Sequence, residues 1–362
     1  MKTIFSFDGG GVRGAITVAF LERIEQVLQE VSGRTLVENV DLAGGTSTGA
    51  IIAAALSLGY SSQDVRRFYF DLAPKVFQRS RSRIPGIQSR FKAKLLKNEI
   101  VELCGERTLG SPDLQTGFAL ALKRMDTGSP WILSNNPNNP FYNDPADGSY
   151  LGNRHYKLAD ILRASTAAPH YFEPERIKIM EGQPPGLFVD GGVSPYNNPA
   201  LGFLQMVTVP SVGYGWETGI DKLRIVSVGT GSFRDLMDPA SARRLPAAGL
   251  AVKALTGLIN NNSTQVLTLM QMLGETPTRW TINSEIGDLS GVLLAKEPLF
   301  QFLRYDVRLE KDWLKQELDI NISDSELTHL RLMDQPKTIP ELYEIGKLAA
   351  KIQVKKEHFL PS

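Results

Sequence analysis

A serine lies at the centre of a glycine-flanked pentapeptide, Gly45-Thr46-Ser47-Thr48-Gly49. An apolar run precedes it and an alanine-rich run follows it, a pattern that predicts a strand, a tight turn and a helix. The glycines two residues before and after the serine let the backbone bend sharply enough to expose the hydroxyl. The N–H groups at the start of the helix favour negative charge beside that oxygen. Ser47 is therefore a candidate nucleophile, with Gly45 and Gly49 forming its elbow.

A second glycine-rich turn follows the first apolar stretch and has the sequence Gly9-Gly10-Gly11-Val12-Arg13. Acyl transfer to a serine needs hydrogen-bond donors for the oxygen that becomes negative in the tetrahedral intermediate. A turn without bulky side chains can direct several backbone N–H groups at one point. We expect residues 9–13 to form this oxyanion hole, with the Arg13 side chain either holding the loop or adding positive charge.

The same turn also fits the dinucleotide-binding pattern G-x-G-x-x-G through Gly9, Gly11 and Gly14. Two features argue against nucleotide binding. Asp8 directly precedes the first glycine, and the ribose-binding acid expected about 20 residues after the turn is represented only by Glu30, inside a predicted helix. No Gly-Lys-Ser/Thr follows, which excludes a P-loop.

The residue pattern offers two kinds of base for the serine. Asp190 ends a short apolar stretch and precedes a glycine pair, Gly191 and Gly192. A carboxylate can act as a base if a partly dry cleft raises its pKa from about 4 toward neutrality. The alternative base is one of four histidines, none of which lies in a strand-end loop between glycines: His155, His170, His329 and His358. Asp190 is better placed, but the residues alone do not exclude a histidine.

The elements that would position these residues follow from hydrophobic periodicity. The first 60 residues contain two strand–turn–helix units, with strands at residues 3–7 and 40–46 and a helix at about 15–30. Further strands are expected at 118–123, 131–134, 187–189 and 223–228. Repeated strand–helix units predict an α/β fold with parallel strands, whose functional loops lie at the carboxyl ends of the strands.

Three motifs together resemble one known family, the patatin-like phospholipases. They are Asp8-Gly-Gly-Gly-Val-Arg-Gly14, Gly45-Thr-Ser-Thr-Gly49 and Asp190-Gly-Gly192, in that order. Three further segments are similar to landmarks of the same family: Arg163-Ala-Ser-Thr-Ala-Ala-Pro169 followed by Tyr171-Phe172, Asn197-Asn198-Pro199 and Gly229-Thr230-Gly231. The resemblance covers about residues 1–235.

The resemblance implies a three-layer α/β fold with a mostly parallel central sheet flanked by helices. It implies a Ser–Asp dyad without histidine, with Ser47 as nucleophile, Asp190 as base, residues 9–13 as oxyanion hole and Gly191 and Gly192 as the supporting turn. The expected reaction is calcium-independent hydrolysis of phospholipid or lysophospholipid acyl esters through an acyl-enzyme, with no metal and no cofactor. Because bacterial members include effectors that cyclic nucleotides switch on, the alternative is a signal-regulated effector phospholipase of bacterial defence, activated by a cyclic nucleotide or a partner.

Composition limits the other functional classes. The 362 residues include 40 Lys+Arg and 39 Asp+Glu, so no global charge favours a nucleic acid polymer as partner. A single cysteine, Cys104, excludes an internal disulfide framework and fits a reducing compartment. The sequence has neither a secretory signal nor an apolar run of about 18 residues that could span a bilayer. We expect a cytoplasmic protein that contacts membranes peripherally.

The remaining segments carry less specific signals. We expect a catalytic domain over residues 1–310 and a helical extension over 311–362 that packs on it. Helices are predicted at 247–258 and 264–273, a possible strand at 279–283, and helix starts at the capping boxes Ser323-x-x-Glu326 and Thr338-x-x-Glu341. Residues 72–98 contain eight basic residues and no acid, which fits either a solvated segment or an arm that contacts lipid phosphates.

Overall fold

The computed structural model describes residues 1–77, 89–237 and 246–360. Its strands are β1 (Lys2–Phe7), β2 (Leu42–Thr46), β3 (Gly117–Arg124), β4 (Pro130–Ser134), β5 (Glu175–Ile177), β6 (Gly186–Asp190), β7 (Leu223–Val228) and β8 (Gln301–Tyr305). Its helices are α1 (Gly14–Ser32), α2 (Thr48–Ser57), α3 (Ser62–Val76), α4 (Ala93–Cys104), α5 (Leu158–Ser165), α6 (Ala200–Thr208), α8 (Ala247–Leu273), α9 (Lys311–Leu318), α10 (Asp324–Leu330) and α11 (Ile339–Gln353).

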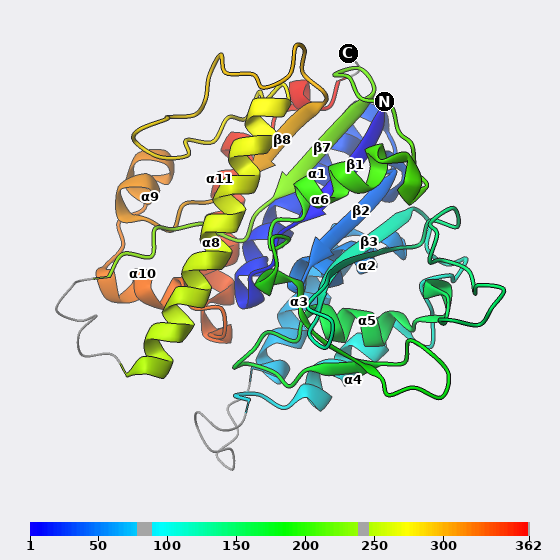
Figure 1. Ribbon diagram of the computed structural model, residues 1–362. Coiled ribbons are helices and arrows are strands. Elements are labelled where there is room, and N and C mark those ends of the chain that lie inside the picture. Colours follow the sequence, from blue (N-terminus) through cyan, green and yellow to red (C-terminus); the bar gives the residue numbers. More distant parts are fainter. Residues whose placement is uncertain (78–88, 238–245, 361–362) are drawn as a thin grey trace.

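Within these residues the strands form one eight-stranded sheet in the order β5-β6-β3-β2-β1-β7-β8, with β4 also paired to β3 (Figure 1). The pairs β3–β2, β2–β1, β1–β7 and β7–β8 are parallel. In contrast, β4 and β6 run antiparallel to β3, and β5 runs antiparallel to β6. The sheet is therefore mostly parallel, as expected, with antiparallel strands confined to one side.

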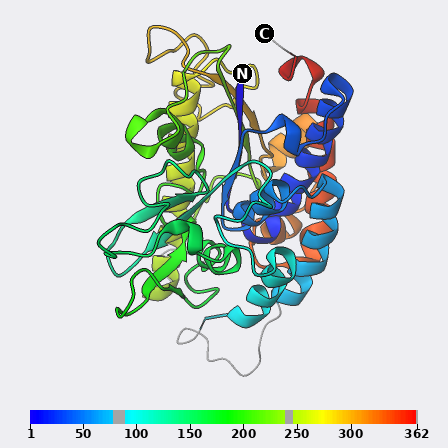
Figure 2. The same cartoon turned by 90° about the vertical axis from the view of Figure 1, so that its right-hand side faces the viewer.

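Helices cover both faces of the sheet, and Figure 2 shows it edge-on between two helical layers. On one face α1, α2, α3 and α11 pack against a large apolar cluster, and on the other α6 and α8 pack against a second one. The central strand β1 supplies both clusters, because Phe5 and Phe7 point to the first and Ile4 to the second. This is the predicted three-layer α/β architecture.

Residues after 310 pack directly on the N-terminal part of the chain. Helix α11 crosses α1 so closely that a Cβ built on Gly346 would lie 2.9 Å from Ala19 Cβ and 3.0 Å from Ile16 Cα. The C-terminal helices thus share the core of the first apolar cluster. The division into a catalytic domain ending at residue 310 and an extension stays a prediction.

Three local expectations differ from the structure. Residues 247–273 form one continuous helix, α8, rather than two, and residues 279–283 contain no strand. Thr338 does not form a capping box, because a 3-10 turn that starts at Pro336 already places its backbone in the helical region. The capping box of Ser323 with Glu326 is present at the start of α10.

The basic segment 72–98 is only partly described, and Arg79, Arg81 and Arg83 lie outside the described residues. Three of its other cations form ion pairs with acids from elsewhere in the chain: Lys75 with Glu99 at 2.9 Å, Arg90 with Asp334 at 2.6 Å and Lys97 with Glu175 at 2.7 Å. These ion pairs hold the segment against the rest of the protein. No helix in the described part of the chain is long and apolar enough to cross a membrane.

Candidate active site

Ser47 occupies a strained turn between β2 and α2. Its backbone has φ 56° and ψ −125°, a sparsely populated combination for a residue with a side chain that costs about 1–3 kcal/mol. The flanking glycines make this turn possible. A Cβ on Gly45 would lie 2.2 Å from the carbonyl carbon of Gly49, and a Cβ on Gly49 would lie 2.3 Å from the Phe7 oxygen. The close contacts give a physical reason for a glycine at both positions, and the role of Ser47 as nucleophile stays a prediction.

Asp190 reaches the serine because β6 runs antiparallel to its neighbour. In the register of the sheet Asp190 pairs with Leu122 of β3, and the adjacent Ala121 pairs with Thr46 of β2. The last residue of β6 therefore lies level with the residue before the nucleophile. The sequence predicted a strand that ends at Asp190, but not the strand direction that brings the two residues together.

The Asp190 carboxyl is buried, with 4% of the residue exposed. Burial raises its pKa to about 6, although hydrogen bonds from the Ser47 side chain and the Gly192 backbone and the charge of Arg163 favour the ionised form. The Gly192 N–H donates to Oδ1 at 2.7 Å, so the Gly191-Gly192 turn fixes the carboxylate. The pair combines a serine hydroxyl with a neighbouring carboxyl whose pKa is raised toward neutrality, which are the properties that a nucleophile and its base require.

Only some of the N–H groups in the glycine-rich loop after β1 donate hydrogen bonds to other described residues. Three donate within the protein: Gly9 to the Asn197 carbonyl at 3.0 Å, Val12 to that of Met333 at 2.9 Å and Arg13 to that of Gly10 at 3.3 Å. In the part of the chain that the structure describes, the N–H groups of Gly10 and Gly11 have no acceptor. Of the five predicted oxyanion-hole residues, these two have backbone donors left for a ligand.

Thr230 fixes the orientation of one of these donors. Its hydroxyl donates to the Gly9 carbonyl at 3.0 Å, and that carbonyl belongs to the same planar peptide group as the Gly10 N–H. Contact at this point is close, since a Cβ on Gly10 would lie 2.2 Å from the Thr230 hydroxyl oxygen. Only glycine fits there.

The Arg13 side chain holds the loop in place. Its guanidinium is buried and donates to the Gly231 carbonyl at 2.8 Å. Burial lowers its pKa to about 10, so it remains charged at neutral pH. Arg13 was expected either to hold the loop or to add positive charge, and its contact with Gly231 supports the first role.

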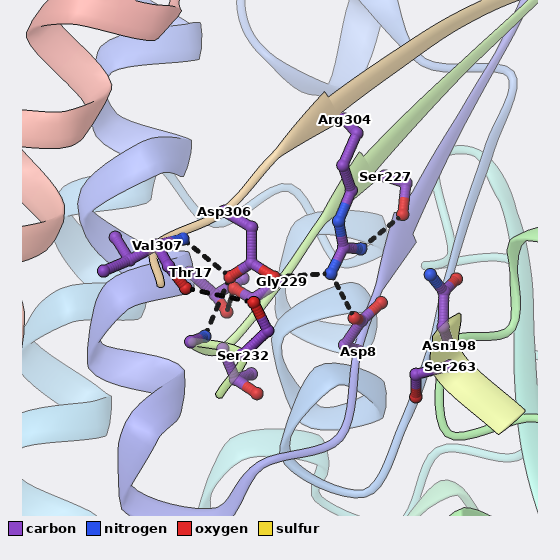
Figure 3. A network of polar contacts seen from close by, with 12 residues as sticks. Asp8, Thr17, Asn198, Ser227, Gly229, Ser232, Ser263, Arg304, Asp306 and Val307 are labelled. Atoms are coloured by element: carbon purple, nitrogen blue, oxygen red, sulfur yellow. Dashed lines mark hydrogen bonds and ion pairs between the residues drawn. The ribbon is translucent and has the colours of Figure 1, made fainter. Parts of the chain in front are cut away.

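A buried ionic network supports the same loop from the last strand of the sheet (Figure 3). The Arg304 guanidinium contacts Asp8 and Asp306, each at 2.7 Å, and donates to the Ser227 hydroxyl at 2.7 Å. Asp306 also accepts the Gly231 N–H at 2.9 Å. Burial raises the pKa of Asp8 to about 6 against the effect of the Arg304 charge. A possible strand at 300–309 was expected, but the ionic roles of Arg304 and Asp306 were not, because neither residue lies in a recognisable motif.

A cavity of about 290 Å³ opens beside the serine and the aspartate. Apart from Ser47, Asp190 and the glycine loop, its walls are mostly apolar and come from several helices and the segment after α5, for example Ile51, Val76, Leu96, Phe172, Leu255 and Ile259. Such a lining suits an extended hydrocarbon chain better than a polar substrate.

In the described part of the chain, none of the four histidines is hydrogen-bonded to the serine. His155 is exposed and contacts Asp144 at 2.7 Å, and the buried His358 contacts the Tyr305 hydroxyl at 2.9 Å. His329 lies exposed on α10. His170 lines the cavity, but among the described residues no hydrogen bond joins any of the four rings to Ser47. The described residues also include no cluster of three or more His, Cys, Asp or Glu that could hold a metal ion.

Ser165 is a site residue that the sequence did not single out, although it lies in the segment 163–169. Its hydroxyl accepts the Ser47 N–H at 2.9 Å and donates to the Ala121 carbonyl at 2.7 Å. The strained elbow is thereby tied to β3.

Comparison with known proteins identifies the family. The model of the patatin-like phospholipase family matches residues 5–204, more than half of the chain, and the chain belongs to this family. Patatin-like protein 1 of Arabidopsis thaliana is 28% identical over 295 residues, covering 74% of this chain and 66% of the relative.

Two bacterial relatives are similar to the same extent. The cUMP-AMP-activated phospholipase of Escherichia coli is 28% identical over 270 residues, covering 75% of this chain and 77% of that protein. The cGAMP-activated phospholipase of Vibrio cholerae is 27% identical over 251 residues, covering 66% of each. The chain thus spans about two thirds to three quarters of the length of these relatives. Among solved structures, VipD from Legionella pneumophila aligns with 95% of this chain and 67% of its own, at 12% identity and a TM-score of 0.38.

The role of Ser165 can be tested by stability. We expect Ser165→Ala to lower the free energy of unfolding by about 1–3 kcal/mol, because it leaves the Ser47 N–H and the buried Ala121 carbonyl without this partner. Urea unfolding followed by circular dichroism measures the change. Ser57→Ala is the matched control: Ser57 is equally buried, but its hydroxyl has no hydrogen-bond partner among the residues that the structure describes, so its removal should cost little. Equal losses in both variants would contradict the assigned role.

Proposed function

We propose that this protein hydrolyses acyl esters of phospholipids or lysophospholipids, with Ser47 as nucleophile and Asp190 as its base. The observation that carries the proposal is a buried carboxylate of raised pKa that interacts with a strained serine on the wall of an apolar cavity. The family membership supports the same reaction. The protein would contact the membrane peripherally from the cytoplasm and bind its substrate at the membrane surface.

The geometry suggests the following steps. Asp190 accepts the hydroxyl proton while the Ser47 oxygen attacks the ester carbonyl carbon, and the carbonyl oxygen becomes negative. The N–H groups of Gly10 and Gly11 donate to this oxyanion. In comparable sites, one such donor lowers the activation free energy by about 3 kcal/mol. The carboxylic acid then protonates the departing alcohol, which leaves an acyl-serine. Water, activated by Asp190, releases the fatty acid and restores the serine.

The cavity gives a reason for the expected specificity. The acyl chain would lie along the apolar walls, and the ester carbonyl would lie between Ser47 and the glycine loop. Binding energy from the chain would then hold the carbonyl in place for attack.

A second candidate is the signal-regulated effector phospholipase. What favours it is that relatives in Escherichia coli and Vibrio cholerae are named for activation by cUMP-AMP and cGAMP. In this proposal the hydrolytic site is the same, and a cyclic nucleotide or a protein partner controls it.

The dyad predicts a specific pattern of loss. Asp190→Asn and Ser47→Ala should each lower kcat/KM on a phospholipid substrate at least a hundredfold, because the first removes the base and the second removes the nucleophile. Substitution of each histidine by alanine should leave hydrolysis in place, as should Asp147→Asn, a matched change at an exposed aspartate. Product analysis by mass spectrometry measures all variants. A histidine variant as inactive as Ser47→Ala would replace the dyad with a triad.

The pH dependence should follow the Asp190 carboxyl. Only the ionised carboxylate accepts the serine proton, so kcat/KM should rise with pH through about 6 and level off above it. Initial rates on a soluble short-chain ester between pH 4.5 and 8 measure this limb. The same limb in Asp8→Asn would assign it to Asp190 rather than to Asp8, whose pKa is similar. A rate that does not change over this range would contradict a carboxylate base.

The regulated alternative predicts a different basal state. Under it, the purified protein should be nearly inactive on phospholipid vesicles, and a cyclic dinucleotide should increase hydrolysis at least tenfold. A constitutive enzyme should be active without it. Fatty acid release with and without cUMP-AMP or cGAMP distinguishes the two, with Ser47→Ala as the blank. High activity that neither nucleotide changes would exclude the switch for these ligands.

A further inference from the structure

The two ends of helix α8 are packed differently. Near its C-terminus Val266, Leu267 and Met270 are buried in the second apolar cluster. In contrast, none of the side chains from 249 to 265 is buried. In Figure 1 this N-terminal part extends beyond the carboxyl ends of the parallel strands. Half of a long helix is thus held at the surface.

The exposed half of α8 is apolar on two sides. One side lines the cavity at the serine through Ala251, Leu255 and Ile259. The adjacent side, about 100° around the helix, carries Leu250, Ala254 and Leu258 at helical spacing, all exposed, with Leu250 49% and Leu258 59% accessible. We call these three residues the outer strip.

The exposed half of α8 has few charged residues that could favour contact with water. Lys253 is the only charged residue between 247 and 262, and its ammonium group forms an ion pair with Asp235. An uncharged apolar strip is unfavourable in water, and contact with hydrocarbon removes this cost.

Two cations lie close in sequence to a residue of another cavity wall. Lys92 and Lys94 are exposed, close in sequence to Leu96, which lines the cavity from α4. Among the described residues, neither lysine forms an ion pair. Apolar residues on one helix and unpaired lysines near another suit a surface that has phosphate groups above hydrocarbon.

We propose that the outer strip of α8 docks the protein on a phospholipid membrane, so that the entrance of the cavity faces the bilayer. The cavity side of the helix then lies next to the lipid phase, about 100° around the helix axis from the outer strip, and an acyl chain passes along the helix to Ser47. The identity of the substrate rests on the proposed function, whereas the docking does not depend on catalysis.

Vesicle flotation tests the docking. All proteins carry Ser47→Ala, which prevents hydrolysis during the assay, and the vesicles are phosphatidylcholine. The pair Leu250→Asp and Leu258→Asp should weaken partitioning at least tenfold. The control pair is Leu348→Asp and Ile352→Asp, which changes two aliphatic residues of similar exposure, 45% and 49%. Both lie on α11 in the opposite helical layer, so this variant should bind vesicles like the parent. Equal flotation of the α8 pair and the parent would overturn the proposal.

A single-site label tests the orientation without a charge in the helix. Cys104 is fully buried, and burial raises its pKa to about 12, so an introduced cysteine can be labelled selectively. An environment-sensitive fluorophore on Leu258→Cys should shift to shorter wavelength when phosphatidylcholine vesicles are added, and one on Leu348→Cys should not. The absence of a shift at position 258 would overturn the proposal.

Two further measurements separate the possible failures. With Ser47 restored, the α8 aspartate pair should hydrolyse a soluble short-chain ester at the parent rate, because neither leucine lines the cavity. If the parent cleaves no ester but the flotation result holds, the proposed function fails and the docking stands. If sedimentation shows a dimer that the α8 pair disrupts while vesicle binding is unchanged, the outer strip is a contact between two copies, and membrane docking is overturned.

Discussion

The contact between the first two strand–helix turns is the constraint on which the site depends. Gly49 at the start of α2 lies against the carbonyl oxygens of Phe7 and Asp8, so close that a Cβ would be 2.3 and 2.7 Å from them. On the other side, a Cβ on Gly9 would be 3.3 Å from Ser47 Cβ. The serine turn and the donor loop therefore approach each other closely because glycines occupy the positions between them. Any side chain at these glycines would push the two turns apart.

That contact also explains why the elbow can remain strained. A backbone in a sparsely populated conformation persists only when its neighbours leave no alternative. Ser47 has such neighbours: its N–H is bound by Ser165, and the helix that follows begins against the end of β1. The strain keeps the hydroxyl outside the turn, beside a carboxylate that the desolvated surroundings make more basic.

Sequence reasoning located the residues whose requirements are local. Glycines at 9, 10, 45 and 49 are demanded by close backbone approach, and short-range patterns predicted the strands that place Ser47 and Asp190. It did not find interactions that depend on register or on distant elements. Nothing in residues 186–190 indicates that β6 runs antiparallel to β3. The Arg304 network and the exposed half of α8 arise from contacts between segments far apart in the chain, and the possible strand at 279–283 had no neighbouring strand to pair with.

The network of Arg304 has a consequence for biosynthesis. Asp8 and Arg304 are separated by 296 positions in the sequence, yet they form an ion pair at the sheet's carboxyl edge. Proteins are made from the N-terminus, so the serine and the aspartate leave the ribosome long before β8 does. Until then Asp8 lacks its guanidinium partner, and Gly231 lacks the Asp306 carboxylate that binds its N–H. The order of synthesis itself delays completion of the donor loop's support until nearly the whole chain has been made.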